Sequence, residues 1–235
     1  MFKKLLKKPK TPPIAFDDYL EDIPKLHTWD NGETWVTGGF KKEHLRLIHD
    51  TIQAHFNGAP VSVLETGAGN STLTFLLLKA AKLLSICPDP HLHQRIKNYC
   101  DAHHIDRSQL DYRVDFSEWE LPGIAGRVRK GADRFDVAFM DGGHGWPTVF
   151  VDFCYMNFVL KKGGLLVTDD IQLHSVKELC RLLEEQPGFR CVEKLNKIRI
   201  WVKEEAPDLL PDHGAEPYIT RMSETYRDAG NLWDL

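Results

Sequence analysis

From residue 61 onward, short apolar runs alternate with longer stretches in which apolar residues recur every three or four positions. The runs predict seven strands, at 61–65, 83–87, 110–114, 135–140, 163–168, 189–193 and 198–203. Apolar runs of this length, bounded by turn residues, are typical of strands buried in a parallel sheet. The last two runs lie close enough to pair as an antiparallel hairpin. The pattern therefore predicts an α/β fold with a doubly wound, mostly parallel, seven-stranded Rossmann-like sheet and a C-terminal antiparallel hairpin.

Helices are predicted between these strands and before the first one. Leu45, Ile48, Ile52 and Phe56 recur at helical spacing, and further helices are predicted at 71–82, 91–103, 147–160, 174–186 and, in the tail, 218–227. The chain divides into a basic, proline-broken lead-in (1–34), the domain that contains the sheet (35–205) and a C-terminal tail (206–235). The lead-in is expected to be loosely held up to about residue 25.

Acidic residues follow three of the predicted strands. Glu65 ends the first strand, Asp141 follows the fourth, and Asp169 and Asp170 follow the fifth. Ligands of open α/β sheets bind beyond the carboxyl ends of the strands. These four side chains are therefore expected to face one crevice, which points to an enzyme for a polar small molecule.

Charge and cysteine content narrow the class of protein. Residues 1–13 hold five lysines and no acid, and the rest of the chain holds 25 Lys and Arg against 34 Asp and Glu. So acidic a body is a poor nucleic-acid binder, because such binding needs basic surface. The lysines suit either a solvated tail or a contact with anionic lipid or a partner. No apolar run is long enough to span a membrane, and five scattered cysteines indicate reduced, cytoplasmic thiols.

The first strand leads into a Gly-x-Gly turn. Residues 65–72 read Glu-Thr-Gly-Ala-Gly-Asn-Ser-Thr, so the glycines allow a tight turn and a close approach of ligand, and Ser71 or Thr72 can cap the next helix. The third glycine of a dinucleotide-binding turn is missing, which disfavours the alternative of an NAD(P)-dependent oxidoreductase.

Together, the turn at 64–72, the stretch Asp136–His144 and the segment Val159–Gly164 followed by Asp169-Asp170 resemble the class I S-adenosylmethionine-dependent methyltransferases. The second and third of these are similar to the branch of catechol-type O-methyltransferases. The resemblance covers roughly residues 35–203. It implies that 35–205 is an S-adenosylmethionine-binding domain.

The resemblance also implies a set of cofactor-binding residues. Glu65, Gly67, Gly69, Asn70 and Ser71 would contact the methionine part, and Thr37, Gly38 and Gly39 would close over it. Ser85 stands where the family usually has the acid that binds the ribose, and Asp89 follows later. Asp115 and Ser117 come where members of the family hold the adenine, and Asp141 also faces the cofactor. The substitution of Ser85 for the acid is the one feature that favours a further alternative, a non-catalytic binding module.

Two mechanisms could remove the proton from an oxygen acceptor: a bound metal ion or a general base. Asp141, Asp169 and Asp170 suit Mg²⁺, a hard cation with oxygen ligands, as in catechol-type relatives. The other interpretation is that Asp169 caps its loop and Asp141 only orders the cofactor. His144 stands where such relatives can carry a catalytic lysine and is the candidate general base, with Asp141 as its catalytic partner; a local structural or cofactor-binding role is the alternative. His174 is a second candidate.

The predicted function is therefore transfer of a methyl group from S-adenosylmethionine to a small molecule at a hydroxyl oxygen, with a nitrogen acceptor left open. Divalent-metal assistance belongs to the same hypothesis. We expect a small-molecule partner, no nucleic acid and no membrane span. The sequence leaves open whether the protein forms a homo-oligomer.

Overall fold

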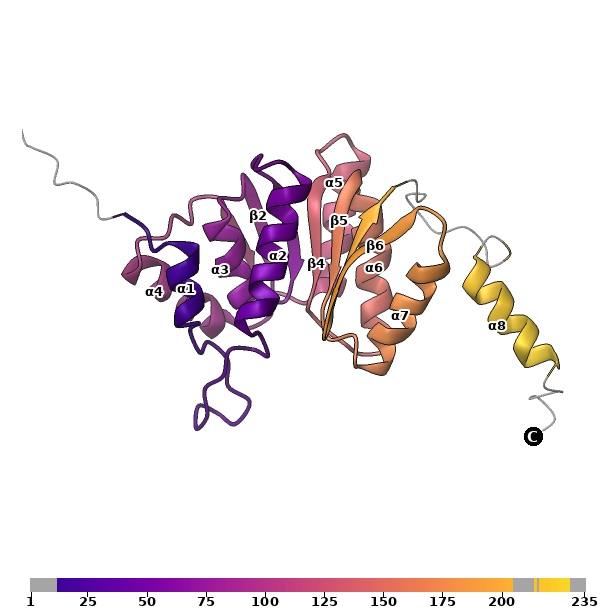
Figure 1. Cartoon of the computed structure of the whole chain (residues 1–235), viewed down its shortest axis with the longest axis horizontal. Coiled ribbons are helices and arrows are strands. Elements are labelled where there is room, and N and C mark those ends of the chain that lie inside the picture. Colours follow the sequence, from indigo (N-terminus) through magenta and orange to yellow (C-terminus); the bar gives the residue numbers. More distant parts are fainter. Residues whose placement is uncertain (1–11, 205–213, 215, 229–235) are drawn as a thin grey trace, which may run out of the picture.

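The computed structural model describes residues 12–204, 214 and 216–228. Within them the chain forms one seven-stranded sheet in the order β3-β2-β1-β4-β5-β7-β6 (Figure 1). The strands are β1 (Ser62–Thr66), β2 (Lys82–Ile86), β3 (Leu110–Arg113), β4 (Phe135–Met140), β5 (Leu160–Thr168), β6 (Phe189–Leu195) and β7 (Ile198–Lys203). β1 to β5 pair in parallel, and β7 runs antiparallel to both β5 and β6. The predicted Rossmann-like sheet with its C-terminal hairpin is confirmed.

Helices cover both faces of this sheet (Figure 1). One face carries α1 (Phe16–Glu21), α2 (Lys42–His55), α3 (Asn70–Leu77) and α4 (Pro90–Ala102), and the other carries α5 (Ser117–Arg129), α6 (Thr148–Val159) and α7 (His174–Glu185). The helix α8 (Pro217–Asp228), which agrees with the helix predicted in the tail, packs against α7.

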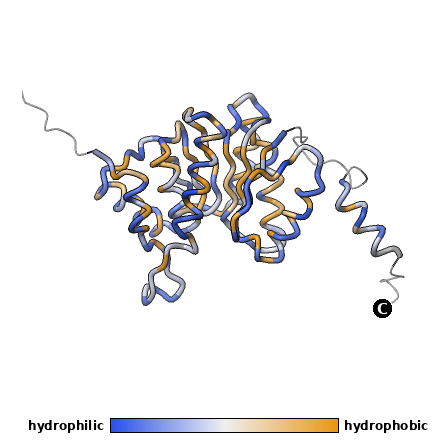
Figure 2. Tube along the Cα trace, viewed as in Figure 1, coloured by the Kyte–Doolittle hydropathy of each residue, from blue (hydrophilic) through white to orange (hydrophobic). Residues whose placement is uncertain are grey.

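The central strands are apolar on both faces, which explains their unbroken hydrophobic runs. In β1, Val63 packs with the α1–α4 layer and Leu64 with the α5–α7 layer, and both are fully buried. Figure 2 shows the same pattern, with hydrophobic residues concentrated along the sheet and hydrophilic ones on the outer sides of the helices. Burial of such a side chain contributes about 1.5–3 kcal/mol.

Two helices are absent from the sequence prediction. Helix α5 contains Pro122 and two glycines, so its pattern looks like a loop, yet Leu121, Ile124 and Val128 recur at helical spacing and are buried. The six-residue α1 is too short for a periodic signal.

The lead-in is more tightly held than its prolines suggest. Tyr19 and Leu20 of α1 are buried in the core, and the Tyr19 hydroxyl donates a hydrogen bond to Asn70 Oδ1 at 2.8 Å. This part of the lead-in is therefore tied to the domain. The lysine-rich stretch 1–11 and most of the residues between 205 and 215 lie outside the described residues, so the predictions made for them stay predictions.

The hairpin brings a distant part of the chain to the ends of the parallel strands. Because β7 is antiparallel to β5, with Thr168 opposite Arg199, the turn at Asn196 and Lys197 lies beside the carboxyl end of β5. The backbone N–H of Ile171 donates to the carbonyl oxygen of Lys197 at 3.1 Å and holds the turn there.

Candidate functional site

Large exposed apolar side chains gather at the carboxyl ends of the strands. Among the described residues they lie in the loop that spans 27–36, after β3, after β4 and after β5; they are Trp29, Trp35, Val114, Phe116, Trp119, Trp146 and Leu173. Exposed apolar side chains at the carboxyl ends of the strands are candidates for contact with a bound ligand. Of the four acids expected to face one crevice at these strand ends, Asp141 and Asp170 are partly exposed, whereas Glu65 and Asp169 are fully buried.

The glycine turn packs directly on the end of β4. Gly67 has a φ of 84°, and a Cβ added to it would lie 2.2 Å from the carbonyl oxygen of Asp141. The backbone N–H of Asp141 donates to the carbonyl oxygen of Thr66 at 3.0 Å. Only glycine allows this approach, so the turn and Asp141 form one rigid unit.

Glu65 is fully buried beneath this turn. Its carboxylate accepts hydrogen bonds from the hydroxyls of Ser71, at 3.0 Å, and Thr72. Ser85 lies beside it in the sheet register, and the Ser85 hydroxyl donates to the carbonyl oxygen of Gly67 at 3.3 Å. Glu65 and Ser85 therefore hold the shape of the turn from below, and the direct cofactor contacts predicted for them stay predictions.

The buried Glu65 makes stability depend on pH. Burial raises the pKa of Glu65 to about 7, although the neighbouring hydroxyls favour the charged form. Because an unfolded chain has a Glu pKa of about 4.3, the folded state binds the proton more tightly. The free energy of unfolding should then fall by about 3 kcal/mol as the pH rises from about 4.3 through 7.

Urea unfolding at pH 5 and pH 7.5 measures this dependence, with Glu65→Gln as the variant that cannot ionise. We expect Glu65→Gln to lose this part of the dependence of the unfolding free energy on pH. Equal slopes for the two proteins would contradict a buried, titrating Glu65.

Asn70 connects the turn to the segment that precedes α2. Its amide nitrogen donates to the carbonyl oxygens of Pro24, at 3.0 Å, and Thr37, at 2.8 Å, and its oxygen accepts from Tyr19. Asn70 is fully buried, and these contacts use its whole side chain. It thereby sets the position of the loop 37–39 against the glycine turn, and the cofactor contacts predicted for Thr37, Gly38 and Gly39 stay predictions.

His27 is a site residue that the sequence does not single out. Cβ atoms added to Gly38 and Gly69 would lie 2.7 and 2.4 Å from its ring, so the imidazole packs against both glycines. Burial lowers the pKa of His27. His27 pairs with Val36 at the base of a loop that projects from the body (Figure 1). A single histidine in a proline-rich segment carries no sequence signal of this role.

The residues predicted for the ribose and adenine lie around β2 and β3. Asp89 is the N-cap of α4; its carboxylate accepts a hydrogen bond from the backbone N–H of His91 at 2.8 Å and pairs with Arg95 at 2.9 Å. Asp115 accepts from the N–H of Phe116 at 2.8 Å, and Ser117 is the buried first residue of α5. Asp89 is the first acid beyond the end of β2, but both of its carboxylate oxygens are engaged within the chain.

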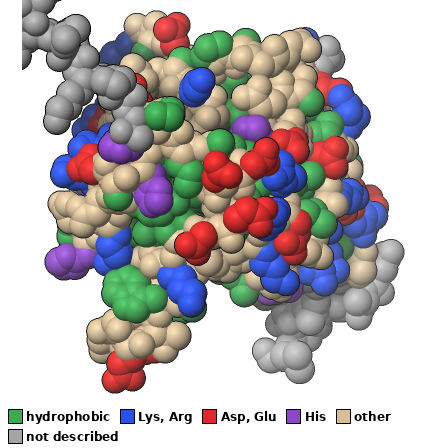
Figure 3. Space-filling model, turned by 60° about the vertical axis from the view of Figure 1, so that its left-hand side comes forward, with side chains coloured by type: hydrophobic (Ala, Val, Ile, Leu, Met, Phe, Trp, Pro, Cys, Tyr) green, Lys and Arg blue, Asp and Glu red, His purple; other side chains and the backbone are tan. Residues whose placement is uncertain are grey.

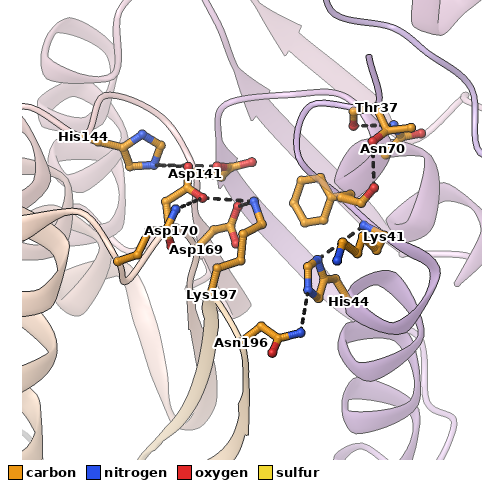
Figure 4. Close-up of polar contacts among 12 residues, drawn as sticks. Thr37, Lys41, His44, Asn70, Asp141, His144, Asp169, Asp170, Asn196 and Lys197 are labelled. Atoms are coloured by element: carbon orange, nitrogen blue, oxygen red, sulfur yellow. Dashed lines mark hydrogen bonds and ion pairs between the residues drawn. The ribbon is translucent and has the colours of Figure 1, made fainter.

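The three aspartates lie close together as expected, but a lysine pairs with two of them. The three are Asp141, Asp169 and Asp170. Lys197 Nζ lies 2.5 Å from Asp169 Oδ2 and 3.1 Å from Asp170 Oδ1 (Figure 4). Burial and the adjacent Asp169 raise the pKa of Asp141 well above its ordinary value. The pKa of Asp170 is lowered: burial opposes this, but the hydrogen bond from Gln172 and the charge of Lys197 outweigh it.

His144 lies over the same cluster. Its Nε2 is 3.7 Å from Asp141 Oδ1 and 3.8 Å from Asp170 Oδ2, and it has no hydrogen-bond partner among the described residues. The Ser175 hydroxyl donates to the carbonyl oxygen of His144 and fixes its loop on α7. A buried nitrogen without a partner is costly, so it is available to a ligand.

A cavity lies next to the loop that carries His144, although His144 itself does not line it. It has a volume of about 720 Å³ and lies between α6, α7 and α8, with Trp146 and His174 at the start of the two helices and Tyr218 and Met222 opposite. The rings of Trp146 and His174 stack with centroids 6.3 Å apart. Concave, mostly apolar spaces of this size are typical of small-molecule sites.

The donor groups favour Mg²⁺ less than the sequence suggests. The atoms that approach within 4.8 Å of one another come from Asp141, His144 and Asp170, so one ligand would be a ring nitrogen, and Asp169 is outside the set. Mg²⁺ prefers oxygen ligands, whereas imidazole suits transition metals. The oxygens of Asp169 and Asp170 are also shared with Lys197. The metal remains a prediction.

The surface agrees with the charge balance of the chain. On the face in Figure 3, Asp and Glu side chains are mixed with Lys and Arg, without a continuous basic area. In the part of the chain that the structure describes, every helix is too short or too polar to cross a membrane.

Residues 64–171 match the model of a family described as a methyltransferase domain. Solved structures with the same fold include the O-methyltransferase TomG from Streptomyces achromogenes in complex with S-adenosylmethionine, at 14% identity and a TM-score of 0.57, covering 71% of this chain and 82% of that one. An O-methyltransferase from Bacillus cereus in complex with S-adenosylhomocysteine has 13% identity, a TM-score of 0.56 and coverage of 71% and 83%. A methyltransferase from Geobacter sulfurreducens has 13% identity, a TM-score of 0.55 and coverage of 72% and 82%. No curated protein shows significant sequence similarity to the chain.

Proposed function

We propose that the chain is a class I S-adenosylmethionine-dependent methyltransferase that methylates a small molecule at a hydroxyl oxygen; the match of residues 64–171 to a methyltransferase-domain family and the shared fold support this. One observation carries the proposal: the glycine turn, Asp141 and His144 meet at one edge of the sheet. Gly67 packs on the backbone of Asp141, and the Asp141 carboxylate lies 3.7 Å from His144. A donor loop and a proton acceptor in one crevice are what the reaction requires.

The edge fits a cationic, amphipathic methyl donor. When bound, S-adenosylmethionine supplies a methyl group on a positively charged sulfur. The bare backbone at Gly67 and Gly69 permits close approach, the carboxylates favour a positive charge, and the exposed aromatic rim suits a flat base. His27 would form one wall of this space, since it packs on Gly38 and Gly69.

His144 would supply the chemistry of the acceptor side. Its buried Nε2 has no hydrogen-bond partner among the described residues and can take the proton of an acceptor hydroxyl. As the oxygen forms its bond to the methyl carbon, the methyl–sulfur bond breaks and its electron pair goes to the sulfur. The negative charge of Asp170, 3.8 Å away, stabilises the imidazolium that results. Alignment of donor and acceptor contributes the rest and can be worth roughly 7–11 kcal/mol.

The cavity between α6, α7 and α8 is the proposed site of the acceptor. It begins at Trp146 and His174, which frame the loop of His144, and its apolar lining suits a largely apolar molecule. Divalent-metal assistance through Asp141, His144 and Asp170 is the alternative that the donor groups allow, and it is tested separately.

Calorimetric titration followed by a transfer assay tests the function. We expect S-adenosylmethionine and S-adenosylhomocysteine to bind the purified protein, and label from the methyl group to reach at least one member of a panel of hydroxylated metabolites. The panel should include amines, which would reveal a nitrogen acceptor. A protein that binds neither compound would overturn the proposal.

A further inference from the structure

Lys197 pairs with two carboxylates of the acidic cluster, although it follows them by almost thirty residues in the sequence. It lies in the turn between β6 and β7, and its carbonyl oxygen accepts a hydrogen bond from Ile171, directly after the two aspartates. This backbone bond and the β5–β7 register fix the turn at the carboxyl end of β5. The side chain therefore starts from a rigid position.

The ammonium group contacts both sides of the crevice. It pairs with Asp169 and Asp170 on one side (Figure 4), and on the other it lies 4.6 Å from the centre of the Phe40 ring. A Cβ added to Gly39 would lie 3.2 Å from Nζ, so the ammonium also packs on the loop 37–39. The Lys197 side chain is 13% exposed and that of Asp169 is fully buried. Both charges are thus largely shielded from water.

We propose that Lys197 is the resident cation of this edge and that methyl transfer proceeds without a divalent metal. This inference rests on the proposed function for its catalytic part. Lys197 acts as a positioning residue: its charge balances Asp169 and Asp170, and its contact with the loop 37–39 holds that loop over the donor site.

Competition between the two cations is the physical reason. A magnesium ion bound to these carboxylates would sit about 2.0–2.1 Å from their oxygens. Lys197 Nζ already lies 2.5 and 3.1 Å from oxygens of the same two groups. A magnesium ion and the Lys197 ammonium bound to the same two carboxylates would lie close together, and two cations this close repel strongly in a poorly hydrated site. Removing the lysine charge should therefore create affinity for a divalent ion that the natural protein lacks.

The test compares the full-length protein with Lys197→Met, which keeps the apolar stem, and Lys197→Arg, which keeps the charge. Lys194→Met is the control, because Lys194 lies in the same hairpin but is exposed and pairs only distantly with Glu184, at 3.8 Å. Thermal unfolding and calorimetry with magnesium chloride and manganese chloride measure metal binding, and turnover is measured with the metal and with EDTA.

We expect unchanged turnover of the natural protein in EDTA and no shift of its unfolding temperature with either metal. Lys197→Met should gain metal binding and lose about 10²-fold in turnover, because the donor and acceptor would be misaligned, whereas Lys197→Arg and Lys194→Met should show no gain in metal binding. Loss of natural activity in EDTA with recovery in Mg²⁺, or metal binding by the natural protein, would overturn the inference. Metal binding needs no acceptor, so a failure of the proposed function would be recognised separately.

Discussion

Replacing His144 with Ala is expected to lower turnover by about 10²–10⁴-fold, the range for loss of a general base. The reason is local: Nε2 is the one titratable ring nitrogen that faces Asp141 and Asp170, and it is buried without a hydrogen-bond partner among the described residues. Affinity for S-adenosylmethionine should stay near that of the natural protein, because the glycine turn does not depend on this side chain.

Steady-state kinetics and calorimetric titration on the same preparation separate these effects. His55→Ala is the matched control, since His55 is exposed and bonds to the carbonyl oxygen of Gly163 at the opposite edge of the sheet. Loss of cofactor binding in His144→Ala would move the residue from proton transfer to the cofactor site. Normal turnover would leave alignment as the main source of rate.

Replacing Gly67 with Ala is expected to abolish S-adenosylmethionine binding and also to destabilise the fold. The sequence alone predicts a soluble chain that has lost only its ligand, even with a residue as large as Val. The structure adds that a Cβ would lie 2.2 Å from the Asp141 carbonyl oxygen, which is backbone and cannot swing away. The φ of 84° adds about 1–3 kcal/mol of strain for any residue with a side chain.

The Gly163→Ala variant separates the effect of backbone strain at positive φ from the effect of a steric clash. Gly163 has a φ of 78°, but an added Cβ would have open space around it. Urea unfolding should therefore show a loss of about 1–2 kcal/mol for Gly163→Ala and a clearly larger loss for Gly67→Ala, with binding retained only in the former. Equal losses in the two variants would show that the turn can move away from β4.

Local pattern was sufficient for the class of fold and for one half of the site. The unbroken apolar runs of β1, β4 and β5 exist because those strands are buried on both faces, so their number and the position of Glu65, Asp141 and Asp169 follow from the sequence. Helix α5 was missed because Pro122 and two glycines are typical of a loop. The helical spacing of its apolar residues stabilises a helix only when they pack against the sheet.

The other half of the site was decided by tertiary structure. Lys197 reaches Asp169 because β7 pairs antiparallel with β5, and His27 covers Gly69 because Asn70 ties the preceding segment to the turn. Asn70, predicted as a cofactor contact, also connects the turn to the preceding segment through its buried side chain, and its cofactor contact stays a prediction. Hydrophobic periodicity reports which face of an element is buried, but not which distant element covers it. The sequence therefore determined where the carboxylates lie, and only the fold decided which cation meets them.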